Sequence, residues 1–472
     1  MLLVLSLPLT PFSAEFSADV NPHKIDTFLE AVIKEDRVPG LAVAIIQRDR
    51  IVYLRGFGVA GTGRAITPQT AFYVGSISKS ITALAVMQLV EAGKVRLDSA
   101  VCDYIPWLTL AEGPASSQIT VRDLLNQVSG ITDTALTRQF PPDTTLEECA
   151  RAFAKVRPVM VPGAGFRYSN MNYRILGLLV ETVSGESFEE YLRRHIFAPL
   201  EMTHTTASPV GVDLAQGYIP VLGFPVAFAQ RHLAYAVPSG YIISTAEDMA
   251  HYLIAQVNEG LYGENRVLSP RGMGLMHTSR SDLRSPYAMG WFEIKWNGWR
   301  VIRHSGDLDT FHADAILFPE RGYGVALLYN LNGFLPGGLV FPEVANGLIR
   351  MLTGQLPQHR WSAAGASALL AAIMAVTLGL EVVSLLTLPR WRLKMESQPM
   401  WRRNTDIAWA LVFPAMPVLA LVFASLTGWV PSLRFFFLRA PDICTWLCAW
   451  SAIGVSKSAA RALLSFVDAR RS

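Results

Sequence analysis

The chain has 472 residues, of which 17% are charged and 51% are hydrophobic. Soluble proteins usually carry about 25% charged residues, so this balance indicates membrane segments in a chain long enough for more than one structural region. The net charge is only +3, without a dense basic block before residue 388, which argues against nucleic acid as a partner.

Residues 1–18, MLLVLSLPLTPFSAEFSA, resemble the apolar core of an export signal followed by small residues suited to cleavage near Ala14 or Ala18. The positive residues that usually precede such a core are missing, so either the true start lies upstream or the segment is atypical. We expect export, with residues 1–18 as the signal segment.

Residues 41–61 predict two strands around a polar turn at residues 47–50. Within them, residues 56–61 match G-x-G-x-x-G, the pattern of a dinucleotide site. Such a site requires a helix to open at that point, whereas a turn-rich stretch with Pro68 follows. The segment therefore predicts a β-hairpin and no nucleotide site.

Residues 80–270 are mostly helical in period, with amphipathic helices that end near a glycine at 121–131, 172–185 and 245–260. From residue 287, short aromatic and β-branched runs between Asn-Gly and Arg-Gly turns predict antiparallel strands. Strands at both ends with helices between them predict an α/β domain over residues 20–355, in which the terminal strands share an antiparallel sheet beside a helical lobe.

The stretch 217–240 is unusually apolar for a loop. Three interpretations are open: ordinary core between the two lobes, the wall of a pocket for an apolar substrate, or a surface that touches the membrane.

Beyond residue 360 the composition becomes that of a membrane region. Residues 363–388 carry Glu381 as their only charge before Arg390 and, at about 25 residues, are long enough to span a bilayer. Residues 407–430 form a second such stretch, in which two prolines are tolerable. Residues 441–464 are a weaker third candidate, because Lys457 and Arg461 interrupt them. We expect two or three transmembrane helices within residues 363–467.

The loop between the first two candidates is basic, which by the positive-inside rule places it in the cytoplasm. Its basic residues, against one Glu396, are Arg390, Arg392, Lys394, Arg402 and Arg403. The preceding domain then lies outside the cytoplasm, in agreement with an export signal.

The four cysteines do not define a disulfide framework. Whether Cys102 and Cys149 pair is left open by the sequence, and Cys444 and Cys448 stand one helical turn apart in an apolar stretch. No set of Cys and His has zinc-ligand spacing, and His-Glu-x-x-His is absent. We expect neither a metal nor another cofactor.

Ser76 and Lys79 stand three residues apart, just before an apolar run from Ile81 to Val90. The plain interpretation is that Ser76 or Ser78 caps a helix and that Lys79 points to water. The catalytic interpretation is that residues i and i+3 share a helix face, so that Lys79 reaches the Ser76 hydroxyl and takes its proton.

Two further motifs follow in order, Tyr168-x-Asn170 on a loop before a helix and His304-Ser305-Gly306 on a probable strand. Each alone has a structural explanation: a packed aromatic, a turn residue or a strand histidine. In combination with Ser-x-x-Lys, they resemble the serine β-lactamase and penicillin-binding protein superfamily. The closest resemblance is to the group of class C β-lactamases, D-alanyl-D-alanine carboxypeptidases, D-aminopeptidases and carboxylesterases, over roughly residues 22–350.

The resemblance implies Ser76 as nucleophile and Lys79 as its base. Lys79 must then be deprotonated or share its proton, and a partly buried site beside other positive groups would lower its pKa. Tyr168 is the partner base, with a phenolate favoured by nearby cations, and later protonates the leaving group.

The resemblance also implies the substrate contacts. Asn170 hydrogen-bonds a substrate amide, and the strand residues 304–306 (His304, Ser305 and Gly306) bind substrate. The oxyanion hole is formed by the N–H groups of Ser76, at a helix N-terminus, and Asp307.

Other acid–base candidates match no motif position: His204, His251, His277 and His312. Asp309 and Asp314 are interpreted as loop and sheet-edge charges. His304 stands where many β-lactamases have lysine; because histidine is mostly neutral at pH 7, this weakens the case for dedicated antibiotic hydrolysis. Gln127 replaces a histidine that relatives often show, without an expected effect on mechanism.

Two functions of different class remain. The first is an exported, membrane-anchored serine hydrolase that acts through an acyl-enzyme on D-amino-acid amides of cell-wall peptides or on related esters, with β-lactamase or carboxylesterase activity as variants. The second is a penicillin-binding receptor or non-turnover membrane sensor. The expected partners are small peptide, ester or β-lactam substrates and membrane lipid.

Overall fold

The computed structural model describes residues 21–108, 119–133, 140–154, 158–280, 285–357, 362–426 and 437–469. The predicted signal segment 1–18 lies outside the described residues. The chain forms two compact units. The first comprises residues 1–218, 227–332 and 341–360, and the second comprises residues 219–226, 333–340 and 361–472.

The first unit is built on a seven-stranded sheet in the order β10-β11-β12-β13-β1-β2-β3. The strands are β1 (Gly40–Gln47), β2 (Arg50–Gly61), β3 (Arg64–Ala65), β10 (Phe292–Trp296), β11 (Trp299–Asp307), β12 (His312–Phe318) and β13 (Tyr323–Tyr329). All neighbours are antiparallel, and β1 pairs with β13 from Leu41↔Tyr329 to Gln47↔Tyr323. The prediction that strands from both ends of the chain share one antiparallel sheet is confirmed.

The first hairpin is also confirmed. β1 and β2 pair around a turn in which Arg48 has a positive φ of 55°. Residues 56–61 lie within β2, so the G-x-G-x-x-G pattern opens no helix. Gly56 is required by packing instead, because an added Cβ would stand 2.3 Å from the Ile66 carbonyl oxygen.

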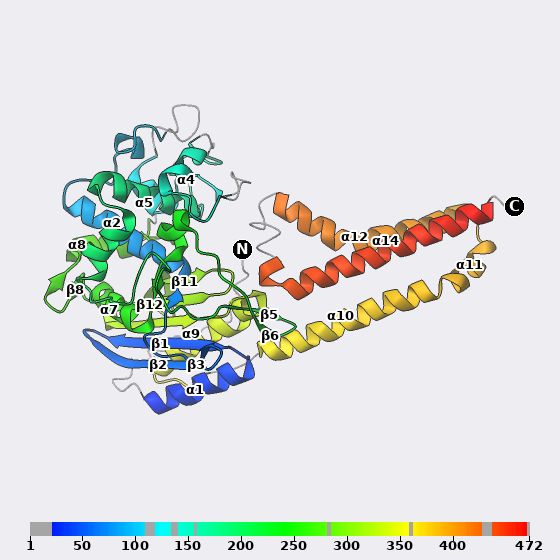
Figure 1. The fold of residues 1–472 in the computed structure, drawn as a ribbon, viewed down its shortest axis with the longest axis horizontal. Helices are drawn as coiled ribbons and strands as arrows, with labels where there is room; N and C mark the ends of the chain where they lie inside the picture. The colour runs from blue at the N-terminus through cyan, green and yellow to red at the C-terminus, as the bar shows by residue number, and fades with distance from the viewer. Residues whose placement is uncertain are drawn as a thin grey trace. The chain divides into compact units, whose positions relative to one another are not determined.

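Helices cover both faces of the sheet, which explains why β12 and β13 are buried along their whole length. α7 (Ala246–Val257) packs on β1 and β13, with Leu253 against Gly324. α1 (Pro22–Glu35) and α9 (Phe341–Leu352) pack together through Phe28. In Figure 1, α1 lies along one side of the sheet and α2, α5 and α7 along the other.

The helical lobe forms much as the capping signals predict. α3 (Val121–Leu125) begins at a Thr120 capping box and is shorter than the predicted 121–131. α5 (Asn170–Ser184) begins after Ser169 and ends at Gly185 with a φ of 77°. The remaining elements are α4 (Leu146–Phe153), α6 (Phe188–Leu192), α8 (Pro270–His277), β4 (Phe72–Tyr73), β7 (Ile243–Ser244), β8 (Leu261–Tyr262) and β9 (Asn265–Arg266).

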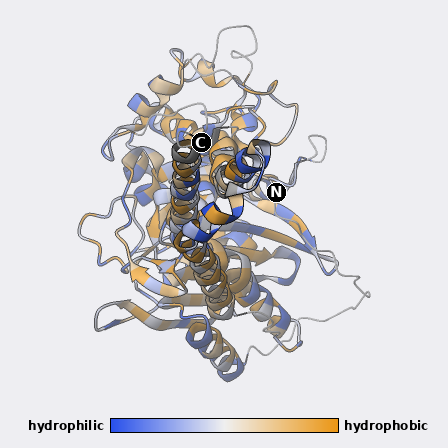
Figure 2. Ribbon diagram, turned by 90° about the vertical axis from the view of Figure 1, so that its right-hand side faces the viewer, coloured by the Kyte–Doolittle hydropathy of each residue, from blue (hydrophilic) through white to orange (hydrophobic). Residues whose placement is uncertain are grey.

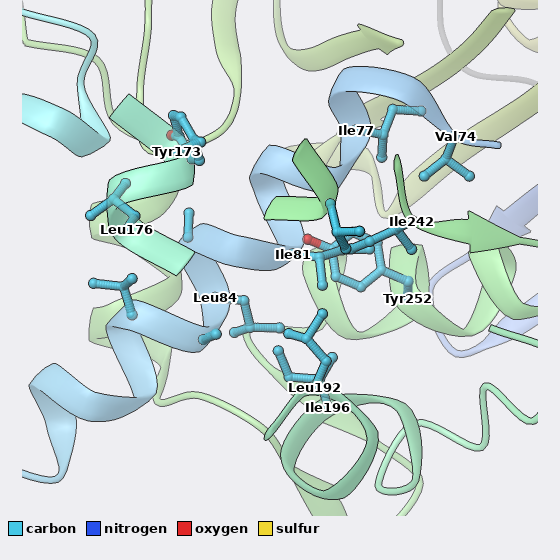
Figure 3. Packing of buried hydrophobic residues seen from close by; sticks show 14 of the residues in the cluster. Val74, Ile77, Ile81, Leu84, Tyr173, Leu176, Leu192, Ile196, Ile242 and Tyr252 are labelled. Carbon is cyan, nitrogen blue, oxygen red and sulfur yellow. The ribbon is translucent and has the colours of Figure 1, made fainter. Parts of the chain in front are cut away.

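α2 (Ser78–Glu91) runs through the core of this unit, with every residue from Ser78 to Met87 buried. A helix that is apolar all round must be enclosed on every side. Figure 3 shows how this is done. Ile81 and Leu84 lie among side chains contributed by other segments, including Tyr173, Leu176, Leu192, Ile196, Ile242 and Tyr252.

The second unit contains the C-terminal helices α10 (Ala363–Leu386), α11 (Leu388–Glu396), α12 (Met400–Leu426) and α14 (Pro441–Ala469). Hydrophobic residues predominate along α10, α12 and α14 (Figure 2), whereas α11 is mostly polar. Among the described residues, α10 alone is long and apolar enough to cross a membrane by length and composition. α10 is therefore a candidate for the first predicted span, and all of the predicted transmembrane spans stay predictions.

The apolar stretch 217–240 is not one structure. Residues 235–240 are buried core, as one interpretation expected. Residues 218–227 instead form a hairpin of β5 (Tyr218–Val221) and β6 (Phe224–Ala227), in which Leu222, Phe224 and Val226 are exposed. The core interpretation is therefore wrong for this hairpin. Cys102, Cys149, Cys444 and Cys448 are not joined to one another by disulfide bonds.

The enclosed position of α2 yields a stability prediction. Leu84→Ala should lower the free energy of unfolding by about 2–5 kcal/mol, because it removes buried atoms and leaves a cavity. Leu275→Ala on α8, where the side chain is 39% exposed, should change it by roughly 0.5 kcal/mol or less. Thermal unfolding of the detergent-solubilised protein compares the two, and equal midpoints would contradict the enclosed position of α2.

Candidate active site

Ser76 lies in a tight turn, η1 (Gly75–Ile77), directly before α2. Gly75 has a φ of +53°, and a Cβ there would stand 2.5 Å from the Asp307 nitrogen. Only glycine can both adopt this backbone conformation and let the two segments approach so closely. The turn leaves Ser76 partly exposed at the end of a helix that is otherwise enclosed.

Lys79 is fully buried, so the interpretation that it points to water is wrong. Its Nζ lies 3.0 Å from the Ser76 Oγ and 2.8 Å from Asn170 Oδ1, and it also contacts the Ser239 carbonyl oxygen. No side chain caps the start of α2. A neutral amine fits these partners, because its two N–H groups match the Asn170 and Ser239 oxygens while its lone pair accepts the Ser76 proton.

Burial lowers the pKa of Lys79 to about 7. The Asp133 carboxylate acts in the opposite direction, and the Arg174 guanidinium adds to the lowering. The pKa of Lys79 is therefore lowered, as predicted, but the main cause is desolvation rather than neighbouring cations. Near pH 7 a large share of Lys79 is the free amine that a general base requires.

Tyr168 contacts the same hydroxyl, through a hydrogen bond between its phenol and Ser76. Its ring centre lies 4.9 Å from Lys79 Nζ and 5.9 Å from the ring of Tyr287. Burial, followed by the influence of Tyr287, raises the pKa of Tyr168 well above its usual value. The prediction of a phenolate favoured by cations is therefore wrong, and Tyr168 is a neutral phenol that can donate or relay a proton.

The amide nitrogens of Ser76 and Asp307 lie close together. A Cβ added to Gly306 would stand 2.9 Å from the Ser76 nitrogen and 1.9 Å from the Val74 carbonyl oxygen, so β11 runs directly past η1. The next strand, β10, pairs with β11 only as far as Arg303, which leaves residues 304–307 facing the serine.

The direction of the Asp307 N–H follows from the strand register. The Leu308 N–H donates to the Phe311 carbonyl at 3.0 Å, one step beyond the pair Asp307↔His312. Bonded and non-bonded pairs alternate along an antiparallel ladder, so the Asp307 N–H points away from β12, toward the open edge. Two convergent N–H groups beside a serine hydroxyl suit an oxyanion.

His304 is buried beside Tyr168. Its Nδ1 lies 2.7 Å from the Ser305 carbonyl oxygen and its Nε2 lies 3.2 Å from the Tyr287 hydroxyl. Burial, and then the charge of Lys79, lowers the pKa of His304 to about 3. The imidazole is therefore neutral at pH 7, as expected, and supplies no fixed charge for a substrate carboxylate.

The Ser305 side chain is not where the motif predicts. Alternate residues of a strand face opposite sides, and His304 and Gly306 take the side of Ser76. The Ser305 hydroxyl donates to Asp314 Oδ1 at 2.5 Å on the other side of the sheet. A role for this hydroxyl in substrate binding is therefore a wrong prediction, although its backbone borders the site.

Asp133, which matches no motif, organises the Tyr-x-Asn segment. Its Oδ2 accepts from Asn170 Nδ2 at 2.7 Å and from the Asn170 N–H at 3.1 Å. Its Oδ1 accepts from the Ser169 hydroxyl at 2.9 Å and from the Met171 N–H at 3.1 Å. Asp133 thus turns the Asn170 amide so that Oδ1 faces Lys79. The contact of Lys79 with the Ser239 carbonyl oxygen was not predicted either, because a backbone group has no signature in the sequence.

The remaining candidates lie elsewhere. His204 pairs with Asp248, His251 contacts the carbonyls of residues 200 and 201, and His277 bonds Gln256. Asp314 is not a sheet-edge charge, because it is buried within β12. Among the residues that the structure describes, no group of three or more His, Cys, Asp or Glu side chains could hold a metal ion.

A helix-flanked antiparallel sheet with a Ser-x-x-Lys pair at its edge defines a β-lactamase-like fold. The family model described as Beta-lactamase matches residues 25–340. The chain therefore belongs to the beta-lactamase family, a family of serine hydrolases.

Relatives agree with this family. Protein flp of Staphylococcus aureus strain MW2 is 28% identical over 356 residues, which cover 72% of this chain and 67% of that protein. Penicillin-binding protein 4 of Amycolatopsis lactamdurans is 29% identical over 342 residues, which cover 69% and 88%.

Solved structures agree as well. The octameric penicillin-binding protein homologue from Pyrococcus abyssi has a TM-score of 0.60 and 28% identity, over 71% of this chain and 78% of that one. EstCE1, a hydrolase with promiscuous acyltransferase activity, has a TM-score of 0.56 and 22% identity, over 65% and 93%, and supports the fold alone.

The contact between Asp133 and the site yields a pH prediction. The carboxylate raises the pKa of Lys79, so Asp133→Asn should lower that pKa below about 7 and move the acid limb of Ser76 acylation to lower pH. The rate of reaction with a p-nitrophenyl ester, measured from pH 5 to pH 9, reports the midpoint.

Asp98→Asn is the matched control, because Asp98 pairs with Arg122 at the surface. It should leave the midpoint in place. If Asp133→Asn reacted with an unchanged midpoint, the role of Lys79 as the titrating base would be contradicted.

Proposed function

We propose that the chain is a serine hydrolase that acts through an acyl-enzyme at Ser76. The observation that carries the proposal is the buried Lys79, hydrogen-bonded to the Ser76 hydroxyl and with a pKa lowered to about 7. A buried amine with a neutral form at pH 7 is what activation of a serine requires. A purely structural lysine would gain nothing from this position.

In the acylation step, Ser76 Oγ forms a bond to the substrate carbonyl carbon while its proton passes to Lys79 Nζ. The carbonyl electron pair moves to oxygen, which the N–H groups of Ser76 and Asp307 stabilise. Collapse of the tetrahedral intermediate breaks the bond to the leaving group, which takes a proton from Lys79 through the Tyr168 phenol. Water then attacks the ester with Lys79 as base, and Ser76 regains its proton.

The substrate class we propose is a D-amino-acid amide of cell-wall peptides or a related ester. Two relatives are named as penicillin-binding proteins or their homologues, which supports the peptide class. The neutral His304 supplies no charge for a carboxylate at this position of the strand, which is compatible with peptidase and esterase chemistry more than with dedicated β-lactam hydrolysis. The site requires no cofactor for these steps.

We further propose that α10 anchors the enzyme, with the first unit outside the cytoplasm. Two ion pairs lie within the C-terminal helices of the second unit: Glu381 with Lys457, and Asp406 with Arg461 at 2.6 Å. Paired charges are those that apolar helices tolerate, so the two cations that weakened the third candidate span do not exclude it.

The β5–β6 hairpin belongs to the same unit and adds to this proposal. Its exposed Leu222, Phe224 and Val226 form an apolar surface, and the Leu222 N–H donates to Asp442 Oδ2 at the start of α14 at 3.2 Å. A surface of this kind suits contact with lipid at the membrane interface.

The catalytic proposal is tested by intact-mass spectrometry of the full-length protein in detergent after exposure to a fluorescent penicillin and, separately, to a p-nitrophenyl ester. We expect an adduct on Ser76 that disappears in Ser76→Ala and persists in Ser184→Ala, a serine at the far end of α5. Rapid release of the adduct indicates a hydrolase, whereas a persistent adduct indicates a receptor. Equal labelling of Ser76→Ala would exclude Ser76 as nucleophile.

The anchoring proposal is tested through the Glu381–Lys457 pair. Glu381→Leu leaves the Lys457 ammonium unpaired among apolar helices and should reduce the carbonate-resistant membrane fraction. The double variant Glu381→Leu/Lys457→Leu should restore it, because two apolar side chains need no partner. If the single and double variants were extracted alike, the pair would not lie in a membrane.

A further inference from the structure

The side of β11 that faces away from Ser76 carries a cluster of ionised groups. His312 on β12 lies between two carboxylates: its Nδ1 is 2.9 Å from Asp307 Oδ1, and its Nε2 is 3.1 Å from Asp314 Oδ2. The Asn332 amide donates to the same Asp307 Oδ1 at 2.8 Å. The ring of Phe341 from α9 stacks on His312 at 4.0 Å between ring centres.

This cluster connects directly to the oxyanion hole, because Asp307 belongs to both. Its N–H faces Ser76, while its carboxylate reaches across the strand pair to His312. Asp307 and His312 stand opposite each other as a non-bonded pair, whose side chains approach more closely than those of a bonded pair. The Asp307 peptide forms no backbone hydrogen bond to β12 at this pair. The side-chain hydrogen bond between Asp307 and His312 therefore holds the peptide in place.

The Asp307 carboxylate would by itself oppose catalysis. Its charge reaches the site, since it raises the pKa of Tyr168 and acts to raise that of His304. An uncompensated carboxylate on the residue that donates to an oxyanion would repel the negative charge that develops there. An imidazolium in contact with the carboxylate removes most of this field.

We propose that His312 is a positioning residue for the oxyanion hole: as an imidazolium held between Asp307 and Asp314, it fixes the Asp307 peptide and neutralises the carboxylate of that residue. The inference rests on the proposed acyl-enzyme function. It concerns a histidine that matches none of the three motifs.

The protonation state of His312 agrees with this role. Burial alone would lower the pKa of His312, but Asp314 and Asp307 outweigh it and raise the pKa to about 9. The other groups around the ring are Arg303, which contacts Asp314 from β11 at 3.2 Å, and Tyr329 from β13. Burial raises the pKa of Tyr329 well above its usual value, so it adds no charge, and Phe341 from α9 is uncharged.

The pH dependence has a definite sign. The pKa of His312 is raised from its ordinary value of 6.5 to about 9. His312 is therefore fully protonated below pH 6.5 and loses its proton as the pH rises through about 9. The acylation rate should therefore rise near pH 7, as Lys79 loses its proton, and fall near pH 9, as His312 loses its own.

The test is His312→Gln in the full-length protein, assayed with a p-nitrophenyl ester. We expect kcat to fall roughly 10-fold to 100-fold, up to the lower end of the loss caused by removal of an oxyanion-hole donor. KM should change little, and the decline near pH 9 should disappear while the rise near pH 7 remains. A folded variant with the wild-type rate and profile would overturn the inference.

His277→Gln is the matched control, because His277 is also buried and hydrogen-bonded but lies on α8 beside Gln256. It should lower thermal stability without removing the alkaline decline. If His312→Gln does not fold, Asp307→Asn provides a second test of the same inference. In Asp307→Asn no carboxylate remains for the imidazolium to neutralise, so the alkaline decline should weaken or disappear; an undiminished decline that stays near pH 9 would overturn the inference.

These outcomes are separate from those that test the proposed function. The proposed acyl-enzyme function would fail if the wild-type protein formed no adduct, or if Ser76→Ala formed as much adduct as the wild-type protein. Either result is independent of the role of His312. If wild type reacted at Ser76 and His312→Gln reacted equally well, the function would stand and the role of His312 would fall.

Discussion

The burial of one amine is the constraint on which the site depends. Lys79 projects from a helix enclosed on all sides, so its Nζ has no water to bond and must find every partner within the protein. Three segments far apart in the sequence supply them: η1 with Ser76, the start of α5 with Asn170, and the turn at Ser239. The need to satisfy the amine therefore draws the two lobes of the domain together, and the same desolvation gives that amine a pKa near neutrality.

A second constraint is the close approach of β11 to η1. Gly75 and Gly306 permit it, since a Cβ at either position would collide with the backbone of the other segment. β10 stops short of residues 304–307, so the edge that would pair with another strand instead faces the serine. An unpaired strand edge is usually a liability. Here its N–H groups border Ser76, an arrangement that suits the oxyanion of the proposed acylation step.

The sequence predicted the parts of the site that depend on spacing. Ser76 and Lys79 are one helical turn apart, and the motifs of Tyr168 and His304 have a fixed order, so their convergence follows from the fold. Asp133 could not be predicted, because its partners are backbone and amide groups brought to it by the tertiary structure. The state of Tyr168 was mispredicted for a related reason: the balance between cations and desolvation depends on burial, which a motif does not contain. The role of the Ser305 hydroxyl was mispredicted because alternate residues of a strand face opposite sides of the sheet, which turns this hydroxyl away from Ser76.

The site also shows how one fold holds three basic side chains in different charge states. Lys79 and His304 are buried without a carboxylate in direct contact, and desolvation lowers the pKa of both. His312 is just as buried, yet it lies between two carboxylates and keeps its proton. Burial alone therefore does not decide the charge; whether a carboxylate contacts the buried group does. Lys79 and His304 therefore place no fixed positive charge beside Ser76. The negative charge of Asp307 is balanced by His312 on the opposite side of the sheet. A neutral Lys79 next to the Ser76 hydroxyl and a compensated Asp307 carboxylate behind the proposed oxyanion site are two consequences of the same rule.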